Sequence, residues 1–130
     1  MAGTIVCDVI SDGAGNSTAT DNAIYGSAKA WVNFGYVSSA ITIRASYNVS
    51  SVTRSGTGLY TVNLTNALVD TNYATNVTAA RYAYGTISYA CSGFSQPIST
   101  SSVYVYTGYE DSFSGQEPTD SYYCYVAINR

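Results

Sequence analysis

The sequence predicts an all-β fold, an antiparallel β-sandwich of about eight strands. Apolar and polar residues alternate with a period of two from Ile41 to Val49 and again from Tyr60 to Leu64, as in half-buried antiparallel strands. Residues that favour helices, such as Glu, Lys, Leu and Met, are scarce, whereas β-branched and aromatic residues dominate. A chain of 130 residues is expected to form a single domain, residues 1–130.

The same alternation predicts where each strand lies. Strands are expected at residues 4–10, 28–34, 41–49, 60–64, 73–78, 86–91, 102–106 and 122–128. A hairpin turn is expected at Gly56 to Gly58, because glycine accepts a positive φ. A bulge is expected near Ser50 and Ser51, since Val52 is out of phase with Val49. Loops are predicted at residues 11–22, 35–39, 66–72, 81–85, 93–101 and 107–121.

Some of these strands are apolar on both faces. In residues 122–128 one face carries Tyr122, Cys124, Val126 and Ile128, and the other carries Tyr123, Tyr125 and Ala127. An antiparallel sheet in a monomer usually leaves one face to water. A second apolar face therefore indicates burial in an oligomer or display to a ligand. A central strand covered by a long loop would give the same pattern.

Composition excludes several classes of function. The chain carries a net charge of −3 with five cations, and phosphate recognition needs clustered cations, so nucleic-acid binding is not expected. No apolar run approaches the length of a membrane span, so membrane insertion is not expected. The absence of histidine excludes Ser-His-Asp and Cys-His catalysis and histidine-ligated zinc.

The cysteines and the single tryptophan are interpreted as packing residues. Cys7, Cys91 and Cys124 are widely spaced, form no CxxC pair and lie in apolar runs, which favours small buried side chains over a metal or redox site. A disulfide between two of them is the alternative. Trp31 lies in the predicted strand 28–34, where a tryptophan is more often part of the core than a ligand platform.

One predicted loop, residues 107–121, concentrates the acidic residues. Four of the eight acids of the chain lie in it, namely Glu110, Asp111, Glu117 and Asp120. Two carboxylates on either side of a sugar would suit a glycosidase, and carboxylate oxygens would bind Ca²⁺. A solvated or recognition loop needs the same charges, and this is the interpretation adopted. No catalytic residue, metal ligand or cofactor is assigned.

Tyrosine is the most informative residue type, with 14 copies. Its rigid ring with a polar tip suits binding surfaces. Aromatic rings stack on the C–H faces of sugars, while hydroxyl, amide and carboxylate groups bind sugar hydroxyls. The predicted receptor site therefore combines stacking rings with hydrogen-bond acceptors: Tyr82, Tyr84, Tyr109 and Phe113 with Glu110, Asp111 and Asp120.

A long run within residues 24–74 resembles a known family. It reads AKAWVNF from Ala28 and TIRASYNVSSVTRSGTGLYTVNLTNALVD from Thr42, followed by Asn72, Tyr73 and Ala74. This run is similar to the C-terminal domain of tailed-bacteriophage tail fibre proteins, and residues 4–22 are more loosely similar. The family pattern has Asp at the position of Leu59 and Pro at that of Val69. Residues 75–130 match no pattern.

The resemblance implies a homotrimeric knob at the fibre tip of the virion. Residues 24–74 would be scaffold, and residues 75–130 would be the variable part that determines specificity. The domain would bind a host-cell surface receptor, either a polysaccharide or an outer-surface protein, without being an enzyme. Two alternatives are a polysaccharide depolymerase that uses the loop carboxylates and a purely structural trimerisation knob.

Overall fold

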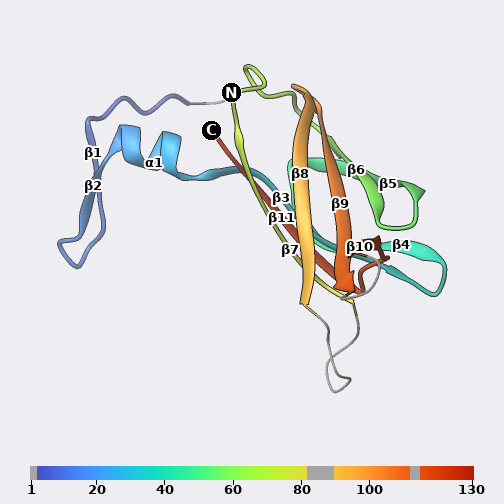
Figure 1. Cartoon of the computed structure of the whole chain (residues 1–130). Helices are drawn as coiled ribbons and strands as arrows, with labels where there is room; N and C mark the ends of the chain where they lie inside the picture. Colours follow the sequence, from blue (N-terminus) through green and yellow to red (C-terminus); the bar gives the residue numbers. More distant parts are fainter. Residues whose placement is uncertain (1–2, 82–89, 112–114) are drawn as a thin grey trace.

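The computed structural model describes residues 3–81, 90–111 and 115–130. It confirms the all-β prediction, because antiparallel strands make up most of the chain (Figure 1). In chain order the elements are β1 (Val9–Ser11), β2 (Ser17–Ala19), α1 (Thr20–Gly26), β3 (Ala28–Val37), β4 (Ala40–Tyr47), β5 (Val49–Gly56), β6 (Leu59–Leu64), β7 (Ala74–Ala80), β8 (Ala90–Ser99), β9 (Ser102–Asp111), β10 (Gly115–Pro118) and β11 (Tyr123–Asn129).

The strands of the body follow one hydrogen-bonded path, β4-β3-β11-β7-β8-β9-β6-β5, with β10 added to β9. We call β4, β3, β11 and β7 the first half and β8, β9, β6 and β5 the second half. Strand β8 links the two halves, since Ala90 and Cys91 pair with β7 whereas residues 92–99 pair with β9. The two ends of the path, β4 and β5, are consecutive strands separated only by Asn48.

The inner faces of both halves contribute to one hydrophobic core. Phe34 on β3 meets Tyr60 on β6 edge to face, with ring centroids 5.1 Å apart. The predicted alternation in residues 60–64 is confirmed, because Tyr60, Val62 and Leu64 are buried while the residues between them are half-buried. The other buried apolar residues are Ala30, Val32, Phe34, Val52, Tyr73, Ala79, Val103, Val105, Cys124, Val126 and Ile128.

Strand β4 does not bury the face that its alternation predicts. A register shift in the β3–β4 pairing leaves Arg44 opposite no residue of β3. Because side chains alternate along a strand, this extra residue changes which side chains face the core. Ile41 and Ile43 lie on the core side, although Ile43 is still 38% exposed, whereas Ala45 and Tyr47 are turned to the outside and are exposed.

The β5–β6 hairpin turns where the glycines predict it. Gly58 has φ +67°, whereas Gly56 has no positive φ, so only one of the two glycines needs the left-handed region. A Cβ atom on Gly58 would lie 2.2 Å from the carbonyl oxygen of Thr107, which also excludes a side chain there. The predicted bulge is confirmed as a register shift between Val49 and Ser51.

Asn48 fixes the corner at which the chain passes from β4 to β5. Its backbone has φ +54°, a left-handed conformation that asparagine tolerates better than most residues. Its amide nitrogen donates to the carbonyl oxygens of Lys29 at 3.1 Å and Asn66 at 3.2 Å. Its amide oxygen accepts from the backbone N–H of Asn66 at 2.8 Å. One side chain therefore connects β3, the β4–β5 corner and the residues after β6.

Two predicted loops are in fact strands. Residues 93–101 continue β8 as far as Ser99, and residues 107–121 contain the end of β9 and all of β10, which form a hairpin. Their glycines suggested loops, but close packing requires them instead. A Cβ atom on Gly93 would lie 2.4 Å from Cγ1 of Val77, and one on Gly108 would lie 2.7 Å from the carbonyl oxygen of Glu117.

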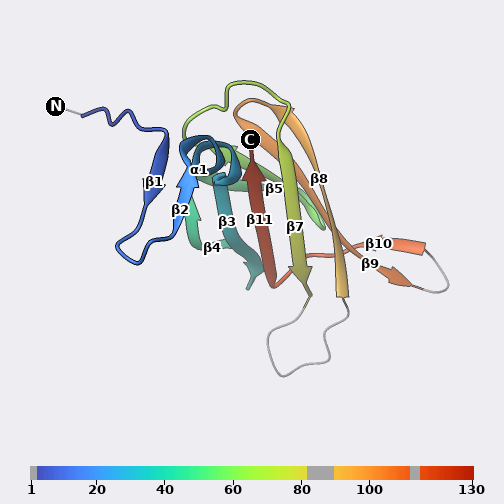
Figure 2. The ribbon, with the colours of Figure 1, turned by 90° about the vertical axis from the view of Figure 1, so that its left-hand side faces the viewer.

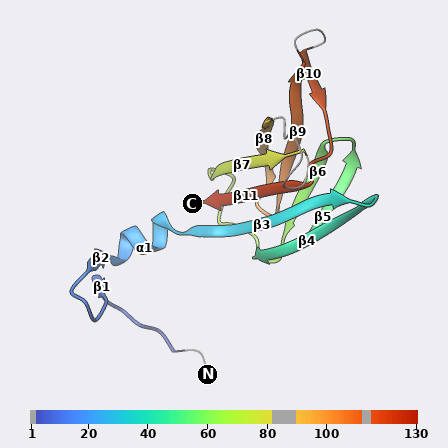
Figure 3. The same cartoon turned by 90° about the horizontal axis from the view of Figure 1, so that it is seen from below.

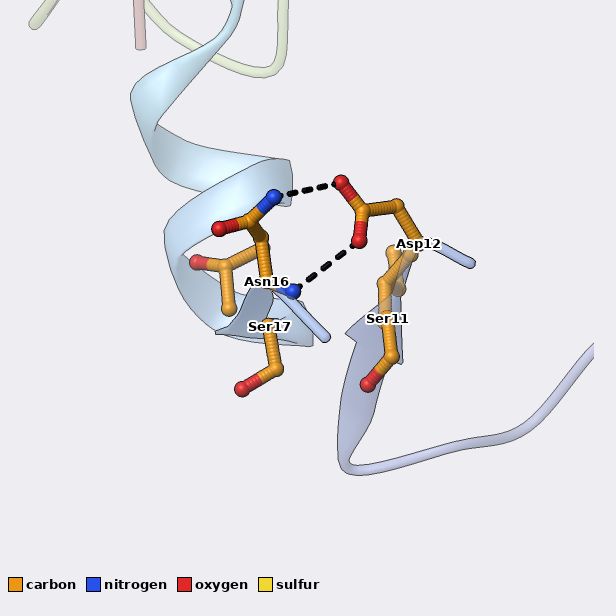
Figure 4. Close-up of a pocket in the computed structure, with 6 residues that line it drawn as sticks. Ser11, Asp12, Asn16 and Ser17 are labelled. Atoms are coloured by element: carbon orange, nitrogen blue, oxygen red, sulfur yellow. Dashed lines mark hydrogen bonds between the residues drawn. The ribbon is translucent and has the colours of Figure 1, made fainter. Parts of the chain in front are cut away.

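The N-terminal residues 3–27 form an arm that extends away from the body (Figure 3). The predicted strand 4–10 is wrong for residues 4–8, and the predicted loop 11–22 contains β2 and the start of α1. The β1–β2 turn is held by Asp12, whose Oδ1 accepts from the backbone N–H of Asn16 at 2.9 Å and whose Oδ2 accepts from the Asn16 amide at 2.8 Å (Figure 4). These hydrogen bonds lower the pKa of Asp12. Lys29 joins the arm to the body, since Nζ donates to the carbonyl oxygen of Ile24 in α1.

The cysteines divide between the arm and the body. Cys124 is buried in the core, as predicted. Cys7 is exposed on the arm, which corrects the prediction of a buried side chain. The side chain of Cys91 lies outside the described part.

Candidate functional site

The β9–β10 hairpin brings together two of the predicted recognition segments. Tyr109 on β9 pairs with Glu117 on β10. The guanidinium carbon of Arg81, directly after β7, lies 4.5 Å from the centroid of the Tyr109 ring. We call the hairpin together with Arg81 the hairpin end; it lies at the opposite end of the body from the arm (Figure 2). Residues from predicted loops 81–85 and 107–121 thus contact each other here.

The other predicted site residues divide into three groups. Glu110 pairs with Gln116 and Asp111 with Gly115, so both belong to the hairpin end, although only their backbone is described. Asp120 lies on the segment that leads into β11, where its side chain is turned to the body. The structure leaves three predicted aromatic residues outside its described ranges, namely Tyr82, Tyr84 and Phe113.

Asp120 is the centre of a hydrogen-bond network within the body. Its Oδ1 accepts from Arg54 Nε at 2.9 Å, from the backbone N–H of Gly58 at 3.0 Å and from the Tyr60 hydroxyl at 2.7 Å. Its Oδ2 accepts from Arg54 Nη2 at 2.7 Å. A carboxylate has about four lone-pair sites, and these four bonds engage its acceptor capacity. The geometry therefore gives Asp120 a structural role in joining β5, β6 and the segment before β11.

This network also determines the charge state of its members. Partial burial alone would raise the pKa of Asp120, but hydrogen bonds from Arg54, Gly58 and Tyr60 outweigh it and hold that pKa below its usual value. Burial, followed by the hydrogen bond to the carboxylate, raises the pKa of Tyr60. Asp120 is therefore ionised, and Tyr60 is a neutral donor, across the physiological pH range.

Of the four acidic residues of 107–121, only Glu117 and Asp120 have described side chains. Among the side chains described within residues 3–81, 90–111 and 115–130, no three acidic or cysteine groups lie close enough together to hold a metal ion. In those same ranges, no helix is long and apolar enough to cross a membrane.

A second candidate surface lies on the outer side of the first half. Strand pairing places Tyr47, Trp31, Ala127 and Asn76 in one row across β4, β3, β11 and β7. The next row consists of Ala45, Asn33, Tyr125 and Thr78. Strands β3, β11 and β7 are seen side by side in Figure 2. We call these eight residues the outer face.

The aromatic side chains of the outer face are open to solvent. Trp31 is 41% exposed, Tyr125 45% and Tyr47 59%. The Trp31 exposure corrects the prediction that this residue belongs to the core. The sequence signal was present, because Trp31 and Asn33 alternate with Ala30, Val32 and Phe34, and the second set alone fills the core.

A groove of about 400 Å³ runs across the outer face between Trp31 and Tyr125. Small residues, Ala45 and Ala127, form part of its lining, and Asn76 and Thr78 supply polar groups at one side. None of its lining residues carries a charge. The complete lining is Trp31, Val32, Asn33, Ala45, Asn76, Thr78, Tyr125, Val126 and Ala127.

Arg44 lies at one end of the outer face, where its Nη1 donates to Oδ1 of Asn33 at 3.5 Å. Its guanidinium carbon lies 4.3 Å from the ring centroid of Tyr123, and Nη2 donates to the carbonyl oxygen of Tyr122 at 2.8 Å. The ring of Tyr123 in turn stacks on Tyr125, with centroids 6.2 Å apart and planes 4° from parallel. These contacts hold Tyr125 in place beside the groove.

The second half has an aromatic cluster on its own outer side. Phe94 on β8 is exposed and lies against Tyr106 on β9, with ring centroids 6.2 Å apart. Along β9, Val103 and Val105 are fully buried, whereas Tyr104 and Tyr106 alternate with them and are half-buried. Both halves therefore present aromatic side chains on the side opposite the core.

Comparison of the chain with family models, with curated proteins and with solved structures gives no match.

Proposed function

We propose that this chain is a receptor-binding domain at the tip of a tailed-bacteriophage tail fibre, and that it attaches the virion to a bacterial surface without catalysing a reaction. The resemblance of residues 24–74 to such fibres is the first support. The observation that favours binding over a purely structural role is the exposure of Trp31, Tyr47 and Tyr125 on strands whose inner faces already complete the core. Exposed aromatic groups of this kind mark interaction surfaces.

The proposed receptor is a surface polysaccharide, with an outer-surface protein as the alternative partner. The chain is poor in charge and rich in tyrosine, which suits stacking on sugars better than pairing with ions. We propose one contact region at the hairpin end, where the ring of Tyr109 lies against Arg81 and where the backbone of Glu110 and Asp111 pairs with β10. The residues Tyr82, Tyr84 and Phe113 remain part of the proposal on the basis of the sequence alone, because they lie outside the described residues.

The proposed assembly is a homotrimeric knob of sandwich-like domains. In this proposal the two halves would form the two layers of the sandwich, and the core that they share supports that arrangement. The arm supports association, because several of its large apolar side chains lie in water: Ile5, Val6, Val9, Ile10 and Ile24. Apolar residues exposed in this number require a partner surface to remain soluble.

Binding of the purified protein to a panel of bacterial cells tests this function. The wild-type chain should bind some strains saturably, and Tyr109→Ala should weaken binding by about 1–2 kcal/mol, as expected for a modest contact residue. Phe94→Ala serves as the control, because it also removes an exposed aromatic ring, on the outer side of the second half. Release of reducing sugar from the bound polysaccharide would contradict the non-enzymatic assignment and favour a depolymerase. Absence of binding to every strain would favour the structural knob.

A further inference from the structure

We propose that the groove on the outer face is a binding site for a neutral oligosaccharide chain, separate from the hairpin end. The site lies over β3, β11 and β7, with Trp31 and Tyr125 as its two aromatic walls. It does not depend on the proposed role of Tyr109, because no residue of the hairpin end lines the groove.

Strand pairing fixes the spacing of the two aromatic rings. Trp31 lies opposite Ala127, and Tyr125 lies two residues before Ala127 on the same strand. The two rings are therefore diagonal neighbours, whose Cα atoms are about 7–8 Å apart in an antiparallel pair. Ala127 and Ala45 carry only methyl groups, so the space beside the rings stays open as a groove. Two rings at this spacing can stack on neighbouring units of one chain of sugars.

The polar groups of the groove have unused hydrogen-bonding capacity. In the part of the chain that the structure describes, the side chains of Asn76 and Thr78 are exposed and make no hydrogen bond. The indole N–H of Trp31 and the hydroxyl of Tyr125 likewise have no hydrogen-bond partner among the described residues. Amide and hydroxyl groups both donate to and accept from sugar hydroxyls, and the indole N–H donates to them. A protein partner that covered the groove with apolar side chains would bury these groups without hydrogen-bond partners, which is unfavourable.

The charges around the groove select against an acidic ligand. No lining residue is charged, and the guanidinium of Arg44, which donates to the carbonyl oxygen of Tyr122 and to Oδ1 of Asn33, lies outside the lining. A sugar acid within the groove would therefore lose water from its carboxylate without gaining a cation from the lining. A neutral chain loses no such charge solvation. This charge complementarity identifies a neutral oligosaccharide as the occupant rather than an acidic polysaccharide.

Tryptophan fluorescence offers a direct test, because Trp31 is the only tryptophan of the chain. The intact protein would be titrated with neutral hexasaccharides of glucose, galactose, mannose or N-acetylglucosamine, and with an oligogalacturonate as the acidic counterpart. At least one neutral probe should give a saturable shift of the emission to shorter wavelength, and the acidic probe should give none. Tyr125→Ala should weaken binding of that probe about tenfold, the loss of one aromatic contact.

Two matched variants complete the test. Asn76→Ala should also weaken the response, whereas Phe94→Ala, which removes an exposed ring on the second half, should leave it unchanged. Unaltered melting temperatures would show that each variant is folded. The proposal is overturned if no neutral probe gives a saturable response, if only the acidic probe does, or if Tyr125→Ala binds like the wild type. A shift of emission with protein concentration alone would also overturn it, because a second copy would then cover the groove.

The attachment function and the groove can fail separately. Loss of cell binding in Tyr109→Ala with no fluorescence response to any sugar would support attachment and overturn the groove site. A saturable response that Tyr125→Ala weakens, in a protein that binds no cells, would support the groove site and overturn attachment.

Discussion

Arg54 and Asp120 form a bidentate ion pair that joins β5 to the segment entering β11, with Nε donating to Oδ1 at 2.9 Å and Nη2 donating to Oδ2 at 2.7 Å. The guanidinium carbon of Arg54 also lies 4.4 Å from the ring centroid of Tyr36 on β3. The pair therefore connects the first half with the second half at the edge of the core. Its side chains are only about a quarter exposed, so water screens the pair less than a surface pair.

Replacing Asp120 should destabilise the fold. Asp120→Ala leaves Arg54, Tyr60 and the Gly58 N–H without their acceptor, and we expect a loss of about 2–3 kcal/mol in the free energy of unfolding. Urea denaturation measures this change. Asp70→Ala is the control, because Asp70 pairs with Arg130 at the chain end, where the pair is more exposed, and should cause a smaller loss. Equal losses in both variants would contradict the structural role of Asp120.

Acid should weaken the fold through the same residue. Asp120 has a lower pKa in the folded chain than the value of about 3.9 expected when unfolded. Its contribution to stability is therefore complete above that value and is lost as the pH falls through the folded-state pKa. We expect the contribution of Asp120 to the free energy of unfolding to stay constant between pH 7 and 5 and to decrease at pH values under about 4.

Asp120→Asn tests the origin of that decrease. The variant should be less stable at pH 7 and should lose less stability between pH 4 and 2 than the wild type. Some acid dependence should remain, because hydrogen bonds from Asn72 and the pairing with Arg130 also lower the pKa of Asp70. A variant with the full acid dependence of the wild type would show that other carboxylates cause it.

The two glycines of the β5–β6 turn should differ in their tolerance of alanine. Gly58→Ala introduces a side chain at φ +67° and 2.2 Å from the Thr107 oxygen, so we expect a loss of at least about 1–3 kcal/mol. Gly56→Ala should be much milder, because its Cβ would meet only the flexible end of Leu59, at 3.2 Å. Thermal unfolding of the two variants side by side checks this. Similar melting temperatures would contradict the observed turn geometry.

The β3–β4 hairpin should be open to stabilisation. Ser38 and Ser39 have φ of +51° and +64°, the pattern of a turn that asparagine followed by glycine prefers. The double variant Ser38→Asn, Ser39→Gly should gain about 1 kcal/mol, because serine is strained in this region. Ser38→Ala with Ser39→Ala should give no gain. A double variant no more stable than the wild type would argue against a left-handed turn.

The arm should affect assembly rather than the fold of the body. Ile5 is 89% exposed and Val6 92%, so Ile5→Ser with Val6→Ser removes no contact of the isolated chain. If these residues bind neighbouring copies, light scattering should give a trimer for the wild type and a smaller mass for the variant. A stable monomer of 13.8 kDa in the wild type would overturn the trimer.

Sequence periodicity predicted the strands that fill the core and failed where tertiary context decides. The alternation of Tyr60, Val62 and Leu64 with polar residues was sufficient to predict that strand, because one face of it is simply buried in the core. The exposure of Tyr47 depends on a bulge in the β3–β4 pairing, which no period within β4 reveals. The helix α1 was not predicted, because it has no long apolar repeat. A hydrogen bond from Lys29, which lies outside the helix, contacts its last turn.

Site prediction had a similar limit. Tyr109, Glu110, Asp111 and Glu117 do lie close together, because they are near one another in sequence, but on the paired strands β9 and β10 rather than in the predicted loop. Asp120 looked the same in sequence, yet its partners Arg54 and Tyr60 are more than fifty residues away in the chain. The second apolar face of residues 122–128 was predicted, but its combination with Trp31 and Asn76 into one outer face was not, since these residues meet only through strand pairing.

The way in which the arm enters the body has a mechanical consequence. It continues directly into β3, which is hydrogen-bonded to β4 on one side and to β11 on the other. A pull on the arm along the axis of β3 would load the backbone hydrogen bonds of both neighbours together, in shear, rather than opening them one after another. Shear shares the force among many bonds, so the body should resist tension from this end far better than tension that peels away the edge strand β4.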